Sequence, residues 1–245
     1  MVTRRNSPED MLGPLPETLQ LGARVHQALV ESIVAGRIAG GSQLRPDVIA
    51  RQLEVSTTPV REAMHRLESD GLAVKLPYQG WFVREFTEQQ IRELYELRAA
   101  LECLSVRLAC QRMSEDDIAR LQQHQAVGEA ALAASDVEAY RAYNRELHAS
   151  ILRSANNSYL SAAMGQVALQ SEMLTGKAIR IVGRPLRAIE EHSRLIQHIA
   201  HRDEQQAVEL MQFHIISALE DILRWNVQPA HEAAAASIDG RSKQI

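Results

Sequence analysis

The sequence predicts a mainly α protein with two domains: a small N-terminal domain of short helices and a β-hairpin, then an all-α six-helix bundle. Helical periodicity runs almost unbroken from Thr87 to Val227, whereas β-rich runs occur only around a glycine turn near residue 80. Aromatic residues make up only 4% of the chain, while Ala, Leu, Glu, Gln and Arg are plentiful. A chain of 245 residues is long enough for two hydrophobic cores.

The chain opens with a segment, residues 1–17, that is rich in proline and carries both signs of charge. We expect it to be a disordered arm. The N-terminal domain is predicted over residues 18–86. Its first helix is expected over Leu19 to Gly36, where apolar residues recur at helical spacing.

Two short helices are predicted next, with room for only a tight turn between them. The first, Pro46 to Leu53, has an apolar face that includes Leu53. The second lies within Val55 to Leu72, and either Ser56 or Thr58 can cap its N-terminus. This arrangement predicts a helix-turn-helix.

Two β-rich runs follow the second helix. They read LAVKLP and WFVREF, and a turn at Tyr78, Gln79 and Gly80 separates them. A β-hairpin directly after a helix-turn-helix predicts a wing.

The outward face of the second helix differs from an ordinary solvated face. It carries hydroxyl and basic groups instead of a mixture of Glu and Lys, in the order Thr57, Thr58, Arg61, His65 and Arg66. Short donors and arginines in front of an apolar face suit a helix that lies in a DNA major groove.

The N-terminal motifs resemble the winged-helix domain of GntR-type bacterial transcription regulators. The strings STTPVREA, RLESDGL and PYQGWFV carry this resemblance over roughly residues 20 to 86. The family usually has Arg directly after the Ser of the first string, where this chain has Thr57, so we expect a related but not identical DNA site. The resemblance implies a homodimer on a short palindromic operator.

We predict eight DNA-binding residues. Thr57, Thr58 and Arg61 are expected in the groove, Gln79 and Gly80 at the wing tip, and Arg45 and Arg51 at phosphates. Ser56, at the start of the recognition helix, completes the set. Residues 1–86 contain ten Lys and Arg and ten Asp and Glu, so the domain has no net charge. DNA binding therefore depends on where the basic side chains point.

Residues 87–228 are predicted to form the all-helical domain, and residues 229–245 a disordered tail. Thr87 and Gln90 have the spacing of a capping box at its start. The chain has 45% apolar and 24% charged residues and no membrane-spanning stretch, and its two cysteines, Cys103 and Cys110, are too far apart along one helix to bridge. We therefore expect free thiols and a cytoplasmic protein.

Three of the nine histidines are predicted to point inward from three different helices of the bundle: His148, His192 and His214. Imidazole nitrogens that converge in this way could bind a divalent cation, with the Asn144 carbonyl as a fourth ligand. Core histidines that are hydrogen-bonded to ordinary partners are the alternative, and the spacing alone leaves both open.

The helical half resembles the ligand-binding domain of the FadR branch of the GntR family, the FCD domain. The strings IRELYELRAALE, NRELHASIL and MQFHI occur in the right order, and six helices fit the VanR-like subgroup. The resemblance implies that Asn144, His148, His192 and His214 hold a metal, with zinc as the first choice and nickel or manganese as the alternatives.

The resemblance also implies a small organic-acid effector near the metal. Arg98 is the first candidate to bind its carboxylate, with a salt bridge to a nearby Glu as the alternative role, and Arg145 and Arg180 are further candidates. We predict a transcription regulator, a repressor whose operator affinity the effector controls, and no enzyme. A regulator with a purely structural metal and a helical metallohydrolase are the alternatives.

Overall fold

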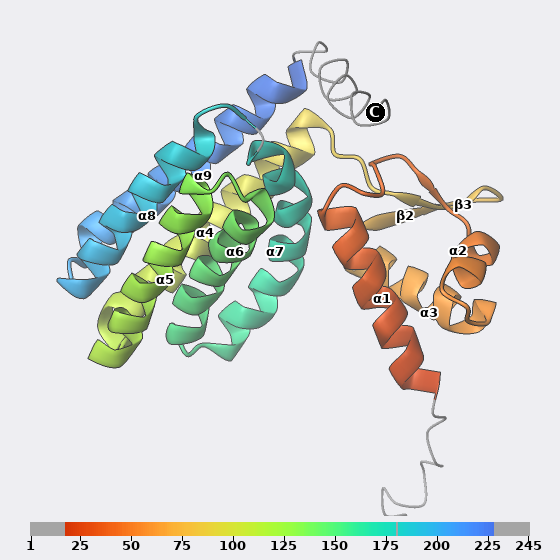
Figure 1. Ribbon diagram of the computed structural model, residues 1–245, viewed down its shortest axis with the longest axis horizontal. Helices are drawn as coiled ribbons and strands as arrows, with labels where there is room; N and C mark the ends of the chain where they lie inside the picture. Colours follow the sequence, from red (N-terminus) through yellow and green to blue (C-terminus); the bar gives the residue numbers. More distant parts are fainter. Residues whose placement is uncertain (1–17, 180, 228–245) are drawn as a thin grey trace, which may run out of the picture. The chain divides into compact units, whose positions relative to one another are not determined.

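The computed structural model describes residues 18–179 and 181–227, and its contacts divide the chain into two compact units, residues 1–85 and 86–245. The arm over residues 1–17, the tail over residues 229–245 and the candidate Arg180 lie outside the described residues. Figure 1 shows the helices and strands of each unit. The predicted fold class, a winged helix-turn-helix plus an all-α bundle, is confirmed.

The N-terminal unit consists of three helices and a three-stranded sheet. Its helices are α1 (Thr18–Val34), α2 (Pro46–Gln52) and α3 (Thr57–Ser69), and its strands are β1 (Gln43–Leu44), β2 (Ala73–Leu76) and β3 (Gly80–Val83). All pairings are antiparallel, and the strand order is β1-β3-β2, so β3 bonds to both neighbours. The β2–β3 hairpin is the predicted wing.

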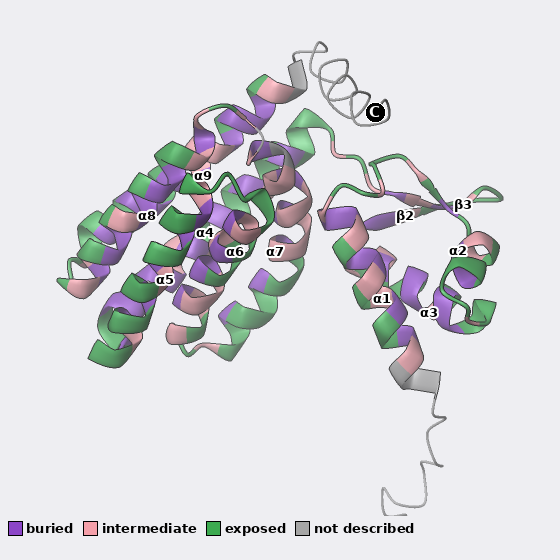
Figure 2. Cartoon of the chain, viewed as in Figure 1, coloured by how far each residue is buried: buried purple, intermediate pink, exposed green. Residues whose placement is uncertain are grey.

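Helix α3 packs against α1 through a fully buried apolar stripe. Val60, Met64 and Leu67 are each 0% exposed, which leaves the opposite face of α3 open to solvent (Figure 2). The expectation that Leu53 lies in this core is wrong, since 39% of it is exposed. Helix α2 ends at Gln52, and Glu54, with a φ of 54°, turns the chain towards α3, so Leu53 leaves the helical stripe.

The C-terminal unit contains six helices among the described residues. They are α4 (Glu88–Arg112), α5 (Glu115–Ala133), α6 (Val137–Ser154), α7 (Ser158–Ala178), α8 (Arg184–Ala200) and α9 (Glu204–Val227). The predicted capping box at the start of α4 is confirmed, because Thr87 and Gln90 satisfy each other's backbone N–H groups.

Helix α4 is the centre of this bundle. It packs against α6, α7, α8 and α9, while α5 packs against α6 and α8. Its inward residues join a hydrophobic core to which α5, α6, α7, α8 and α9 all contribute. Both cysteines are free, and no described helix is long and apolar enough to cross a membrane.

Candidate DNA interface and metal centre

The recognition helix α3 presents its candidate DNA-binding side chains to solvent. Thr57, Thr58 and Arg61 are exposed, and Arg61 has no ion-pair partner among the described residues. Ser56 occupies the N-cap position, but its hydroxyl makes no capping hydrogen bond and stays available. These groups are therefore free to contact DNA without breaking bonds within the domain.

Arg45 and Arg51 flank the same carboxylate at the start of α2. Arg45 Nη2 lies 3.1 Å from Asp47 Oδ2, and Arg51 Nη2 lies 3.7 Å from the same oxygen. All three side chains are more than half exposed, so these pairs hold the arginines weakly. Both guanidinium groups can exchange the carboxylate for a phosphate.

The wing tip is a tight turn at Tyr78, Gln79 and Gly80. Gly80 has a φ of 95°, which favours glycine, and Gln43 Nε2 donates to the Gln79 carbonyl at 2.7 Å. The Gln79 side chain is exposed, and Tyr78 is the most exposed large apolar residue described, at 109%. The sequence analysis did not select Tyr78 as a candidate contact residue of the wing, although an aromatic residue in the turn was a usable signal.

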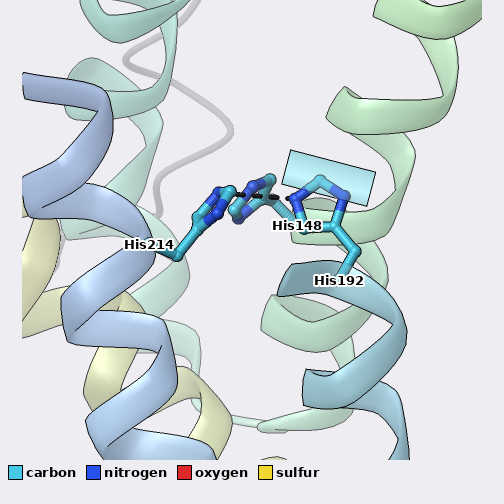
Figure 3. Close-up of side chains that lie close together, drawn as sticks. All are labelled: His148, His192 and His214. Atoms are coloured by element: carbon cyan, nitrogen blue, oxygen red, sulfur yellow. Dashed lines mark hydrogen bonds between the residues drawn. The ribbon is translucent and has the colours of Figure 1, made fainter. Parts of the chain in front are cut away.

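The three predicted histidines converge in the helical domain (Figure 3). His148 comes from α6, His192 from α8 and His214 from α9, and they are 9%, 0% and 5% exposed. One ring nitrogen from each lies within 4.8 Å of the other two. His192 Nε2 and His214 Nε2 lie 3.3 Å apart.

Hydrogen bonds to the other ring nitrogens fix how two of these imidazoles are protonated. His214 Nδ1 lies 2.5 Å from Glu191 Oε2, a carboxylate that can only accept, so Nδ1 carries the proton. Arg184 holds Glu191 in place through contacts of 3.0 and 3.1 Å. His214 Nε2 is therefore left with a lone pair.

The same reasoning applies to His192 through a longer chain of bonds. The Gln125 amide donates to the Ile189 carbonyl and to Glu129, so its oxygen must accept from the Tyr143 hydroxyl at 2.5 Å. Since Tyr143 already donates its hydroxyl proton to Gln125, the hydrogen bond of 3.1 Å between His192 Nδ1 and the Tyr143 oxygen must be donated by His192 Nδ1–H. His192 Nε2 also keeps a lone pair.

Tyr143 can reach this position because α5 has a glycine beside its ring. A Cβ atom built on Gly128 would lie 2.5 Å from Tyr143 Cδ1, far inside normal contact distance. The missing side chain at this point of α5 therefore allows the ring to lie against the helix.

The histidine cluster fits a metal ion. Two lone pairs that face each other at 3.3 Å repel unless a cation lies between them, and nitrogens bound to one zinc at about 2.1 Å with tetrahedral angles are roughly 3.4 Å apart. Burial lowers the pKa of His192 and His214 well below its ordinary value, which keeps both rings neutral. His148 has two buried ring nitrogens without a hydrogen bond.

A buried ion pair on α4 adjoins the cluster. Arg98 contacts Glu102 Oε1 at 3.4 Å, and the same oxygen lies 3.1 Å from His148 Nδ1, although those two atoms are not aligned for a hydrogen bond. Burial raises the pKa of the Glu102 carboxyl, but its interactions with His148 and Arg98 outweigh burial and hold the pKa at about 2. Glu102 therefore stays ionised.

A small cavity of about 30 Å³ opens beside the histidines. Its polar lining combines the candidate metal and effector residues with neighbours from α6, α7 and α8: Arg98, Tyr140, Asn144, His148, Thr175, Arg184 and His214. Arg145 is not in this lining; it is exposed and lies 3.8 Å from Glu172. Arg98 forms the salt bridge to a nearby Glu and also lines the cavity, so carboxylate binding by Arg98 stays a prediction.

Sequence reasoning missed three residues that adjoin the histidines or orient them. Glu102, Tyr143 and Gln125 come from α4, α6 and α5, and only the packing of these helices brings them together. The position of Glu102 one turn after Arg98 was the available signal.

An exposed recognition helix beside a wing, on a chain with a separate helical domain, defines a DNA-binding transcriptional regulator. Two family models match the chain: "Bacterial regulatory proteins, gntR family" over residues 21–83 and "FCD domain" over residues 93–217. The chain belongs to the GntR family and to its branch with an FCD domain, as the sequence motifs predicted.

Known relatives agree with this assignment. A probable D-xylose utilization operon transcriptional repressor of Paenarthrobacter nicotinovorans is 30% identical over 81% of this chain and 87% of its own length. The Nta operon transcriptional regulator of Aminobacter aminovorans is 43% identical, but the match spans only 33% of this chain and 39% of that protein. The solved structure of McbR/YncC from E. coli shares the fold, with a TM-score of 0.75 at 23% identity over 84% of this chain and 98% of that one.

Proposed function

We propose that this regulator is a homodimeric repressor whose operator affinity is controlled by a small organic acid bound beside a divalent metal. The observation that carries the proposal is the pair of unprotonated Nε2 atoms of His192 and His214, which face each other at 3.3 Å. The D-xylose operon relative is described as a repressor, which supports the sign of regulation.

For DNA, we assign Thr57, Thr58 and Arg61 to the major groove, with Ser56 at the start of the same helix. Arg45 and Arg51 are assigned to phosphates, and Gln79 and Gly80 to the wing contact. A two-fold axis relating two recognition helices would match a short palindrome.

For the metal, the assigned ligands are Asn144, His148, His192 and His214, with zinc preferred over nickel and manganese. When bound, the cation would supply a positive charge that attracts a carboxylate oxygen. Glu191 and Tyr143 act as positioning residues, because they hold protons on the Nδ1 atoms and so direct Nε2 towards the site.

For the effector, Arg98 is the residue best placed to bind a carboxylate, because it is 7% exposed and lines the cavity with His148 and His214. A guanidinium group that is shielded from water binds a carboxylate more strongly than an exposed one. The small cavity favours a compact acid. Arg145 and Arg180 remain candidates of lower rank.

Helix α4 offers a route from this cavity to the DNA-binding domain. It carries Arg98 and Glu102, and it begins at Glu88, directly after the division between the two units at Glu85. An effector that binds more tightly to one placement of helix α4 than to another raises the population of that placement. Operator affinity then changes with the placement of the helix.

The test is a thermal melt of purified protein, metal-loaded and chelated, against a panel of small organic acids. An acid about a hundredfold above its dissociation constant should stabilise the loaded protein by roughly 2.7 kcal/mol and the chelated protein much less. Arg98→Ala should abolish this response, whereas Arg92→Ala, at an exposed arginine of the same helix outside the cavity lining, should keep it. A melt that neither chelation nor any acid changes would contradict the metal and effector assignments.

A regulator with a purely structural metal is the second candidate, and the cavity volume of only about 30 Å³ favours it. In that case operator binding would be lost on chelation but would respond to none of the acids. Operator binding measured by fluorescence anisotropy, with and without each acid, separates the two candidates.

A further inference from the structure

Helix α4 is apolar on two faces. One face enters the core through residues such as Ile91, Tyr95 and Val106. A second stripe consists entirely of leucines with alternating spacings of three and four residues: Leu94, Leu97, Leu101, Leu104 and Leu108. That spacing is the a/d pattern with which one helix packs along another.

Most of this leucine stripe is not used by the core of its own domain. Leu94 packs against the core, but the other four leucines lie outside the hydrophobic core formed by the described residues. Leu97 is 51% exposed, and Leu101, Leu104 and Leu108 are partly exposed. Partly exposed leucines in a continuous row are typical of a surface that another helix covers.

We infer that the leucine stripe packs against α4 of a second copy of this chain, with the two helices antiparallel about a two-fold axis. A two-fold interface requires that if residue i faces residue j of the partner, residue j faces residue i. The stripe meets this condition when Leu97 faces the partner's Leu101 and Leu94 faces the partner's Leu104. The inference rests on the homodimer of the proposed function and assigns its surface.

Charges beside the stripe agree with this register. In an antiparallel pair, the residues that precede the a positions face one another across the interface. Here they are Glu93, Ala100 and Arg107. The register sets Glu93 against the partner's Arg107 at both ends of the interface, and leaves the small Ala100 at its centre. Glu93 and Arg107 are both exposed. Among the described residues Arg107 forms one ion pair, with the partly exposed Glu204 at 3.2 Å.

The first test replaces the most exposed leucine. Leu97→Glu should weaken the dimer at least about tenfold, because the charge would be buried against the partner. Val127→Glu is the matched control, since Val127 is 55% exposed on α5 and lies outside the stripe. Sedimentation equilibrium should show a shift towards the 27.4 kDa monomer for Leu97→Glu alone. Helical circular-dichroism spectra equal to that of the wild type would show that both variants fold.

The second test addresses the register. Glu93→Arg and Arg107→Glu should each weaken the dimer about tenfold or more through like charges, and the double variant should recover most of the loss. Two single losses without recovery in the double variant would overturn the antiparallel register.

These outcomes separate the interface from the proposed function. A wild-type dimer that survives Leu97→Glu and both charge reversals would overturn the leucine-stripe interface and leave the metal-dependent repressor intact. A wild-type protein that is monomeric at every concentration, free and on DNA, would overturn both the homodimer and the interface.

Discussion

The recognition helix and the histidine cluster differ in how far their candidate functional side chains are exposed to solvent. On the recognition helix, Arg61 and its neighbours Thr57 and Thr58 project into solvent, opposite a fully buried apolar stripe. In the helical domain, His192 and His214 are part of the buried interior and are 0% and 5% exposed. On α3, the candidate DNA contacts and the support of the fold therefore come from different side chains, whereas in the histidine cluster the same side chains would bind the metal and support the fold.

This difference predicts how substitutions behave. A change on the exposed face of α3 should reduce DNA binding without loss of stability, because no core contact is removed. A change in the histidine cluster should alter both metal binding and stability, because the same side chains support both.

The largest effect is expected for His192→Ala. Metal content should fall from about one ion per chain to near zero, and with it the stabilisation of about 4 kcal/mol that a ligand supplies a thousandfold above its dissociation constant. Elemental analysis and thermal melts measure the two quantities. His198→Ala, on the same helix but outside the cluster, should retain the metal. Full occupancy in the His192 variant would exclude its role as a ligand.

A smaller effect is expected when the chelated protein is acidified. Below about pH 6.5 these histidines gain protons in the unfolded chain, while burial keeps the pKa of His192 and His214 low in the folded one. The unfolded state then binds more protons, so the free energy of unfolding should fall between about pH 7.5 and 5.5, by up to about 1.4 kcal/mol per histidine. Urea titrations at both pH values measure it, and equal stabilities would argue against neutral buried rings.

Arg61→Ala tests the exposed region. Operator affinity should drop by at least about 1 kcal/mol, because we assign the guanidinium group to the DNA. The thermal midpoint should stay unchanged, because Arg61 has no ion-pair partner among the described residues. Fluorescence anisotropy on the operator gives the affinity. Arg37→Ala, an exposed arginine outside the helix-turn-helix, is the control and should bind as the wild type does. Loss of affinity in both variants would point to net charge instead of a specific contact.

The smallest effect is expected for Asp47→Asn. Removing the carboxylate between Arg45 and Arg51 should strengthen DNA binding by roughly 0.5 kcal/mol and steepen its salt dependence. Asp47 lies in the first turn of α2, so the variant should lose a few tenths of a kcal/mol of stability. Weaker DNA binding would show that Asp47 orients the arginines instead of competing for them.

Much of the fold could be predicted from the sequence, because its signals are local. The capping box of Thr87 and Gln90 and the spacing of Val60, Met64 and Leu67 depend only on near neighbours. Leu53 shows the limit of this reasoning: the pattern identifies an apolar residue on the helical face, but the position where α2 ends decides its burial.

The candidate metal site could be predicted only in part. Inward spacing and the family resemblance together selected His148, His192 and His214, which the structure brings together. The bonds that set their protonation come from Glu191, Tyr143 and Gln125, and the last two lie on helices far apart in sequence from the histidine they orient. Such partners follow from packing, which no local pattern records.

Gly128 affects the candidate metal site although it has no functional group of its own. A methyl group there would collide with the Tyr143 ring, because the built Cβ lies 2.5 Å from Cδ1. Displacing the ring would free the His192 Nδ1 proton from its acceptor and let the imidazole rotate. A single added carbon on α5 would thus alter a candidate cation site to which position 128 contributes no ligand. The effect of substitutions at position 128 should therefore follow metal affinity more closely than helix propensity.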